Sequence, residues 1–143
     1  MVDRERVLAK LDELHGYVRE LRALRLEAYE DFTRPETRRA TERLLQIAIE
    51  AVVDICHRLV SGLRLGLPSE EDDLFTKLQE ARIFPPDLIT TLRRMKGFRN
   101  ILVHEYGRVD DRIVYDMATT RLADLGVFQD AVRDALRRLE GAG

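Results

Sequence analysis

Apolar residues recur at steps of three and four along most of the chain, and this spacing limits the possible folds more than any other feature. Residues spaced in this way line one face of an α-helix, where each residue advances by about 100°. The first such segment runs from Val2 to about Asp31. Its apolar positions are Val7, Leu8, Leu11, Leu14, Val18, Leu21, Leu24 and Leu26. The spacing predicts that the chain opens with a long amphipathic helix.

A second helix is predicted from Pro35 onward, and it has a different character. Thr33 is placed to cap it, and Pro35 suits the first turn, where its missing N–H would have no intrahelical partner. The helix contains the run LLQIAIEAVVDICHRLV, which is apolar around most of its circumference. A helix of this kind is surrounded by other elements. We therefore expect it to form the core, either inside the bundle or along a dimer seam.

Glycine and proline divide the rest of the chain into three further helices. The run SGLRLGLP ends the second helix, and Ser69 before EEDDLF predicts the cap of a short third helix that reaches about Arg82. A fourth helix should begin at Pro86 and end at Gly107. A helical turn around Ile113 to Met117 then leads into a final long amphipathic helix. The apolar positions of that helix are Leu122, Leu125, Phe128, Val132, Leu136 and Leu139.

The composition agrees with an all-α fold. Hydrophobic residues make up 45% of the 143 residues and charged residues 35%, with no Trp. We expect one domain, residues 1–143, folded as an up-and-down bundle of about five helices. The opening run MVDRERVLAK has no apolar signal core, no stretch is apolar enough to span a bilayer, and the lone Cys56 suits a reducing compartment. These features predict a cytoplasmic protein with no membrane contact.

The segment RNILVHEY, residues 99–106, brings polar side chains into the last turns of the predicted fourth helix. Helical spacing places Arg99 at the centre of an apolar stripe. The stripe contains Leu88, Leu92, Met95, Leu102, Val103 and Tyr106. A second line beside it contains Arg93, Gly97, Asn100 and His104, with Lys96 between the two lines. Gly97 weakens a helix by about 1 kcal/mol relative to Ala, which favours a close approach of a backbone or a ligand there.

The same helix is predicted to gather four groups that carry or can acquire positive charge: Arg93, Lys96, Arg99 and His104. The formal net charge of the chain is only −2, so binding of a polyanion would depend on a local patch of this kind. Arginine binds phosphate through two parallel hydrogen bonds, and histidine exchanges protons near neutral pH. Tyr106 adds a hydroxyl group. The pattern is therefore compatible with a phosphate-binding site.

Structural explanations for these residues remain open. Arg99 could pair with a carboxylate on the second helix, which carries a polar line. His104 and Asn100 could form a satisfied pair at the helix end, and Tyr106 could pack in the core. A zinc site is not expected, because His15, His57 and Cys56 do not have the spacing of metal ligands. The polar line consists of Glu42, Gln46, Glu50, Asp54 and His57.

The order Arg99, Asn100, His104 and Tyr106 resembles the signature of HEPN domains, and specifically of the HepT-like toxins. The resemblance covers most of the chain. It includes the long first helix, the segment AIEAVVDICHRLVSG, the PS turn before a short helix, and the segments MKGFRNILVHEYGRVDDRIVY and LADLGVFQDAV. The motif alone is short, and these flanking segments make the resemblance specific.

This resemblance implies an all-α bundle that forms a homodimer, with the motifs of both protomers facing each other across the interface. It implies a ribonuclease toxin that cleaves RNA without a metal or another cofactor. It also implies a minimal nucleotidyltransferase antitoxin, which neutralises the toxin by adding AMP to the motif tyrosine. Carried over to this chain, Arg99 and His104 are catalytic, Asn100 supports the site and Tyr106 accepts AMP. Arg93 and Lys96 are candidate contacts for RNA phosphates.

Two other functions are compatible with the same helices. One is a non-catalytic HEPN module that binds the nucleotidyltransferase or presents nucleotide or substrate to it, with Arg99 and His104 as ligand contacts. The other is a purely structural helical dimer, in which Arg99 forms an ion pair with the second helix.

Overall fold

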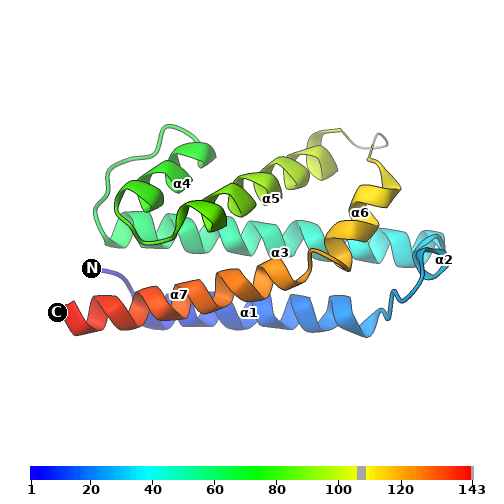
Figure 1. Cartoon of the computed structure of the whole chain (residues 1–143), viewed down its shortest axis with the longest axis horizontal. Helices are drawn as coiled ribbons and strands as arrows, with labels where there is room; N and C mark the ends of the chain where they lie inside the picture. The colour runs from blue at the N-terminus through cyan, green and yellow to red at the C-terminus, as the bar shows by residue number, and fades with distance from the viewer. Residues whose placement is uncertain (106–108, 143) are drawn as a thin grey trace.

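The computed structural model describes residues 1–105 and 109–142, and this part of the chain consists of helices and their connections, without β-strands (Figure 1). The all-α prediction is confirmed. Tyr106 and Gly107, on which two predictions depend, lie outside the described residues. The described part contains α1 (Arg4–Ala23), α2 (Tyr29–Phe32), α3 (Pro35–Gly62), α4 (Glu71–Glu80), α5 (Pro86–His104), α6 (Asp111–Ala118) and α7 (Ala123–Ala142).

The four longest helices, α1, α3, α5 and α7, alternate in direction, and α3 lies between α4 and α5 on one side and α1 and α7 on the other (Figure 1). Helix α3 contacts α1, α2, α4, α5 and α6. Ala48, Ile55 and Leu59 on this helix are completely buried. Cys56 is buried as well, and this burial raises the pKa of its thiol. The prediction that the second helix forms the core of the bundle is therefore confirmed.

The predicted first helix, from Val2 to about Asp31, extends too far at its C-terminal end. Helix α1 ends at Ala23, and Arg25 adopts a left-handed backbone conformation with φ of 51°. The short helix α2 follows after this break, and Phe32 at its end is completely buried. The rings of Tyr29 and Phe32 pack against that of Tyr115 from α6, with centroids 5.5 and 6.0 Å away. The break therefore lets the chain turn and bury aromatic rings that a continuous helix would carry away from the bundle.

Two predicted helix caps are also wrong. The Thr33 hydroxyl donates to the carbonyl oxygen of Glu30 (2.9 Å), so Thr33 belongs to the end of α2, and Arg34 takes the N-cap position of α3. Ser69 lies one residue too early, since Glu70 is the N-cap of α4; the Ser69 N–H donates to Asp73 (3.0 Å). The predicted turn around 113–117 is a helix of eight residues, α6. Because α2 and α6 are not among the predicted helices, the described part contains seven helices, where about five are predicted.

Candidate active site

The last turns of α5 form one wall of a pocket of about 470 Å³, and α3 and the start of α4 form the others. The side chains of Lys96, Arg99, Asn100 and His104 meet there, as the helical spacing predicted. The complete lining is Gln46, Glu50, Glu70, Glu71, Asp72, Lys96, Arg99, Asn100, Val103 and His104. Cationic and anionic groups therefore share one concave surface.

The Arg99 guanidinium is held in place by two neighbours. Its Nη2 donates to Glu71 Oε1 at the start of α4, and its Nε donates to Asn100 Oδ1 (3.1 Å). Only 14% of the Arg99 side chain is exposed, so its orientation is well defined. Arginine carries further N–H donors beyond these two, and no described residue accepts a hydrogen bond from them, so they can donate to an anion in the pocket. The alternative in which Arg99 pairs with a carboxylate of the second helix is not observed, because Glu71 of α4 supplies the carboxylate.

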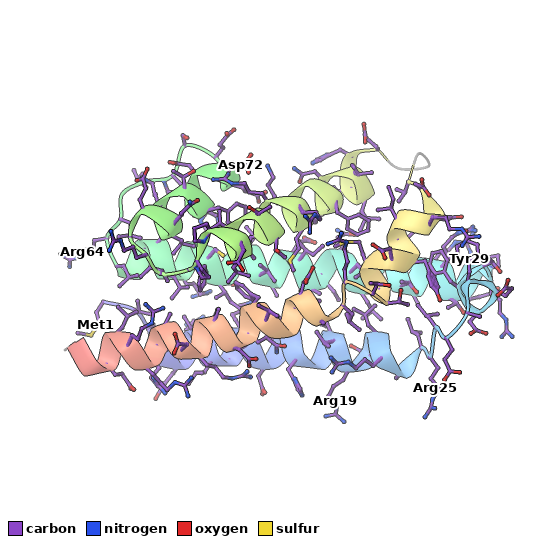
Figure 2. The ribbon with its side chains drawn as sticks, viewed as in Figure 1. Met1, Arg19, Arg25, Tyr29, Arg64 and Asp72 are labelled. Carbon is purple, nitrogen blue, oxygen red and sulfur yellow. The ribbon has the colours of Figure 1, made fainter. Side chains whose placement is uncertain are left out.

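Lys96 and Arg93 share a second carboxylate on α4, that of Asp72, which Figure 2 shows on α4 beside α5. Lys96 Nζ donates to Asp72 Oδ2 (2.6 Å), and Arg93 Nη1 donates to Asp72 Oδ1 (3.3 Å). The hydrogen bond from Lys96, together with the charges of Lys96 and Arg93, lowers the pKa of Asp72. This carboxylate is therefore ionised at neutral pH and neutralises part of the nearby positive charge.

Arg93 does not line the pocket. Its Nη2 donates to Thr76 Oγ1 (2.8 Å), and its guanidinium lies 5.9 Å from the centroid of the Phe75 ring. These contacts direct Arg93 toward α4. The predicted convergence of four cationic groups is thus reduced to three, because Arg93 joins two helices instead of facing the pocket.

His104 is the last residue of α5, and its side chain is exposed at the pocket. Leu88, Leu92, Met95 and Leu102 are buried as predicted for the apolar stripe, whereas Val103 is 41% exposed because it faces the pocket. The close backbone approach expected at Gly97 is not observed, since a Cβ there would have no described neighbour within 4 Å.

The polar line on α3 is divided among several environments. Gln46 Nε2 donates to Glu50 Oε1 (3.0 Å), and both residues line the pocket. Asp54 pairs with Lys10 of α1 (3.5 Å) and with Arg58 (3.2 Å). His57 is exposed. Only the middle of the line therefore contributes to the candidate site.

The sequence pattern does not predict the carboxylates of Glu71 and Asp72 as site residues. The acidic run EEDD favours a helix start because its charges suit the helix dipole, and Glu71, Asp72 and Asp73 do occupy the first turn of α4. Their contacts with Lys96, Arg93 and Arg99 could be inferred from the sequence by matching the acidic run of α4 with the basic residues of α5. A short helix that starts with several acids and directly precedes a helix with several bases can pair with it.

These residues provide two chemical capabilities. Lys96 and Arg99 offer positive charge to an anion, and an exposed histidine beside them can transfer protons near neutral pH. Among the described residues, no group of three or more His, Cys, Asp or Glu side chains is arranged to hold a metal ion. No helix in the described part is long and apolar enough to cross a membrane.

Comparisons with known proteins identify relatives with similar sequences and folds. The chain is 33% identical over 89 residues to the mRNA nuclease HepT of Shewanella oneidensis, an alignment that covers 62% of this chain and 67% of that protein. It is 31% identical over 100 residues to the tRNA nuclease HepT of Aphanizomenon flos-aquae, covering 70% of this chain and 68% of that protein.

The fold is that of a solved toxin. The tri-AMPylated HEPN toxin of Shewanella oneidensis, in complex with its MNT antitoxin, superposes with a TM-score of 0.83 and 24% identity, over 94% of this chain and 99% of that one. The family model described as ribonuclease HepT-like matches residues 14–132. The chain therefore belongs to the HepT-like ribonuclease family.

Proposed function

We propose that this protein is a toxin that cleaves RNA without a metal ion, using Arg99 and His104 as catalytic residues. One observation carries the proposal: an orientated, mostly buried arginine and an exposed histidine line the same pocket. The nuclease names of two relatives support it. Asn100 supports the site through its bond to Arg99, and Lys96 adds a second positive charge for the phosphate.

The chemistry needs a base, an acid and positive charge. A base removes the proton from the ribose 2′-hydroxyl, the 2′-oxygen forms a bond to phosphorus, and the bond from phosphorus to the 5′-oxygen breaks as an acid protonates that oxygen. Negative charge accumulates on the phosphate oxygens in the transition state, where Arg99 can stabilise it. The products are a cyclic phosphate and a free 5′-hydroxyl.

The pocket of one chain contains one histidine. We infer that two chains form a homodimer in which their pockets face each other, so that one His104 acts as the base and the other as the acid. Two Arg99 side chains would then surround the phosphate. In this arrangement the active site is composite, and a single protomer lacks one of the two proton-transfer groups.

We also propose that a minimal nucleotidyltransferase antitoxin silences the protein by adding AMP to Tyr106. Support comes from the sequence motif and from the solved HEPN toxin, which is tri-AMPylated and bound to an MNT antitoxin. Tyr106 follows His104 by two residues. A phosphate-bearing group attached there would compete with RNA for the cationic pocket by both charge and volume.

The cleavage proposal is tested with purified protein and labelled single-stranded RNA, in the presence of a chelator. We expect cleavage by the wild type, and a loss of about 100-fold or more in His104→Ala, since general acid–base catalysis contributes factors of this size. His57→Ala is the matched control, because His57 is exposed and does not line the pocket. Full activity in His104→Ala would contradict the catalytic role of His104, and a wild-type protein that cleaves no RNA would favour a module that only binds its partner.

The antitoxin proposal is tested by measuring the intact mass of the protein expressed with and without the nucleotidyltransferase, followed by peptide mapping of residues 100–108. We expect a gain of one or more AMP units on Tyr106 together with loss of RNA cleavage. The Tyr106→Phe variant should gain no mass. Continued AMP incorporation into that variant would place the acceptor elsewhere.

A further inference from the structure

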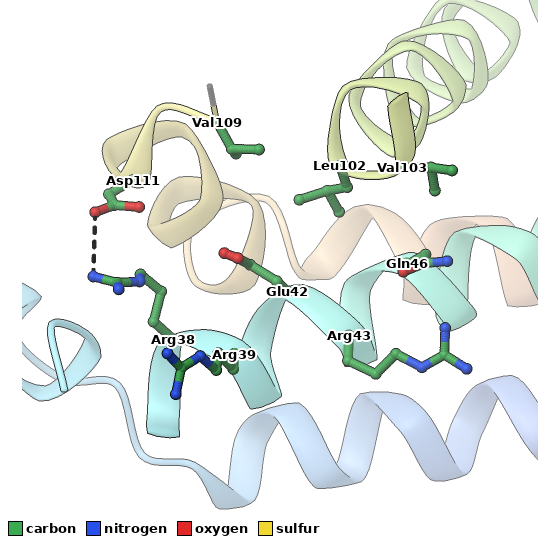
Figure 3. A pocket seen from close by; sticks show the side chains of 9 residues that line it. All are labelled: Arg38, Arg39, Glu42, Arg43, Gln46, Leu102, Val103, Val109 and Asp111. Atoms are coloured by element: carbon green, nitrogen blue, oxygen red, sulfur yellow. Dashed lines mark ion pairs between the residues drawn. The ribbon is translucent and has the colours of Figure 1, made fainter. Parts of the chain in front are cut away.

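A second hollow continues the candidate active site along α3. Its volume is about 720 Å³, and Gln46 and Val103 line both this hollow and the active-site pocket, so the two form one continuous groove. Figure 3 shows the side chains around the hollow. Its lining consists of Arg38, Arg39, Glu42, Arg43, Gln46, Leu102, Val103, Val109 and Asp111. We call this hollow the α3 groove.

Three arginines from α3 line the α3 groove, and two of them form no ion pair with a carboxylate in the described part of the chain. Arg38 pairs with Asp111 of α6 (3.7 Å), as the dashed line in Figure 3 indicates. Arg39 and Arg43 are exposed and form no ion pair with any described residue. This contrasts with the active-site pocket, where Glu71 and Asp72 offset Arg99 and Lys96. The α3 groove is therefore lined by three arginines and two carboxylates, Glu42 and Asp111, and keeps a positive balance of charge.

Helical geometry connects these arginines to the active site. Arg39, Arg43, Gln46 and Glu50 are separated by four, three and four residues, so they follow one face of α3. This row advances roughly 16 Å along the helix axis, and its last member lies in the active-site pocket. The opposite wall is apolar, since Leu102, Val103 and Val109 form it. Cationic side chains on one wall and apolar ones on the other match a strand with phosphates along one edge and bases along the other.

We propose that the α3 groove binds the phosphates of the RNA strand next to the cleaved bond, with Arg39 and Arg43 as the contacts. This inference rests on the proposed ribonuclease function and adds a binding subsite outside the catalytic pocket. An RNA strand is the occupant that the structure favours, because a strand with its scissile phosphate at Arg99 and His104 can continue directly into the groove. Two acidic groups line the groove: Asp111 is paired with Arg38, and Glu42 opposes the binding of a phosphate, although burial raises the pKa of its carboxyl.

The inference is tested with the double variant Arg39→Gln/Arg43→Gln, which keeps two helix-compatible side chains and removes two charges. The matched control is Arg133→Gln/Arg137→Gln, which makes the same charge change on exposed positions of α7. Binding of a 20-nucleotide single-stranded RNA is measured in the His104→Ala background over a range of salt concentrations. Cleavage of the same RNA and of a dinucleotide is measured in the active background.

For the groove variant we expect about tenfold weaker binding at low salt, and a slope of log Kd against log salt that is smaller by about 1.4, since each phosphate contact on a single strand contributes about 0.7. The ratio of kcat/KM for the long RNA to that for the dinucleotide should fall by a similar factor. The control should match the parent protein in all of these measurements.

Three outcomes would overturn the inference, and they are distinguishable. If the parent protein is active and the groove variant has the same RNA affinity and salt slope as the control, the proposed subsite is contradicted and the ribonuclease proposal stands. A parent protein that neither binds nor cleaves RNA would contradict both the subsite and the ribonuclease proposal. A groove variant whose oligomeric state changes in analytical ultracentrifugation, with an unchanged salt slope, would assign the α3 groove to contacts between copies of the chain.

Discussion

Arg99 illustrates how a single residue can be both structural and functional. An arginine with 14% of its side chain exposed needs a partner, and Glu71 supplies the charge that offsets it. The same ion pair sets the orientation of the guanidinium toward the pocket. A carboxylate so close to a phosphate site also opposes the binding of a second anion. Glu71 should therefore orientate Arg99 while weakening the attraction for RNA.

These two effects are separable by substitution. Glu71→Gln keeps an acceptor for Arg99 but removes the negative charge, so we expect a KM for RNA about threefold lower, the size of one charge interaction at about 7 Å in water. Glu71→Ala removes the acceptor as well, and the loosened arginine should lower kcat on the order of tenfold. Steady-state cleavage kinetics measure both parameters.

Glu70→Ala provides the control for the charge effect. Glu70 lines the same pocket and forms no ion pair with any described residue. The Glu70→Ala substitution should lower the KM for RNA without lowering kcat. A decrease of kcat in Glu71→Gln as large as that in Glu71→Ala would show that the carboxylate has a direct role in the reaction and is not only a positioning residue.

At the scale of elements, the contact between α4 and α5 determines the shape of the pocket. Asp72 joins them by accepting hydrogen bonds from Lys96 and Arg93, and Arg93 also contacts Thr76 and Phe75. Helix α4 has only ten residues and too few hydrogen bonds to be stable in isolation. Its position therefore depends on apolar packing and on this polar junction.

Asp72→Asn should weaken the junction, and the effect should depend on pH. The pKa of Asp72 is lowered from its ordinary value of 3.8, because Lys96 donates a hydrogen bond to it and Lys96 and Arg93 attract its charge. A lowered pKa in the folded state means that the carboxylate stabilises the fold above about pH 4 and loses this contribution as the pH falls through the lowered pKa. We expect the variant to be less stable by about 0.5–1 kcal/mol at pH 7, the size of a partly exposed ion pair.

Urea unfolding at pH 7, 5 and 3 measures this difference. The gap between wild type and Asp72→Asn should persist at pH 5 and narrow at pH 3. Asp12→Asn is the control, because Asp12 is exposed and has no ion-pair partner in the described part of the chain. A gap that widens toward acid would contradict the assigned role of Asp72.

The sequence predicts those features of the helices that depend on nearby residues, and it does not predict those that depend on distant contacts. Periodicity identified α3 as the core helix and placed Arg99 and His104 in the last turns of α5, because these features depend on residues close in sequence. The break at Arg25 has no local signal, since neither glycine nor proline lies there, and it depends on the distant ring of Tyr115. The partner of Arg99 cannot be predicted from local sequence for the same reason, because Glu71 reaches it only through the packing of α4 on α5.

At the scale of the whole molecule, the bundle leaves its site open at one surface. Helices α3, α4 and α5 form the walls of this site. The termini lie together at one end of the bundle, where an ion pair between Arg4 and Glu140 (3.0 Å) joins α1 to α7 (Figure 1). The pocket contains one histidine, whereas the proposed reaction uses a base and an acid. The proposed homodimer answers this need by supplying the second histidine.

Mixing Arg99→Ala chains with His104→Ala chains tests that arrangement. Each homodimer lacks one residue type completely, whereas a heterodimer has one intact Arg99 and one intact His104 on different protomers. If the two pockets form one composite site, co-expressed and separately tagged heterodimers should cleave RNA faster than either parent homodimer, because only the heterodimer holds both a proton-transfer group and an arginine at the shared site.

The control for this experiment is a heterodimer in which one chain carries both substitutions and the other is wild type. It has the same total number of intact residues, but both lie on one protomer. Similar rates in the two heterodimers would fit a site that draws equally on both chains. Activity confined to the control heterodimer would show that each pocket works with its own arginine and histidine, and the second proton-transfer group would then have to come from another residue or from water.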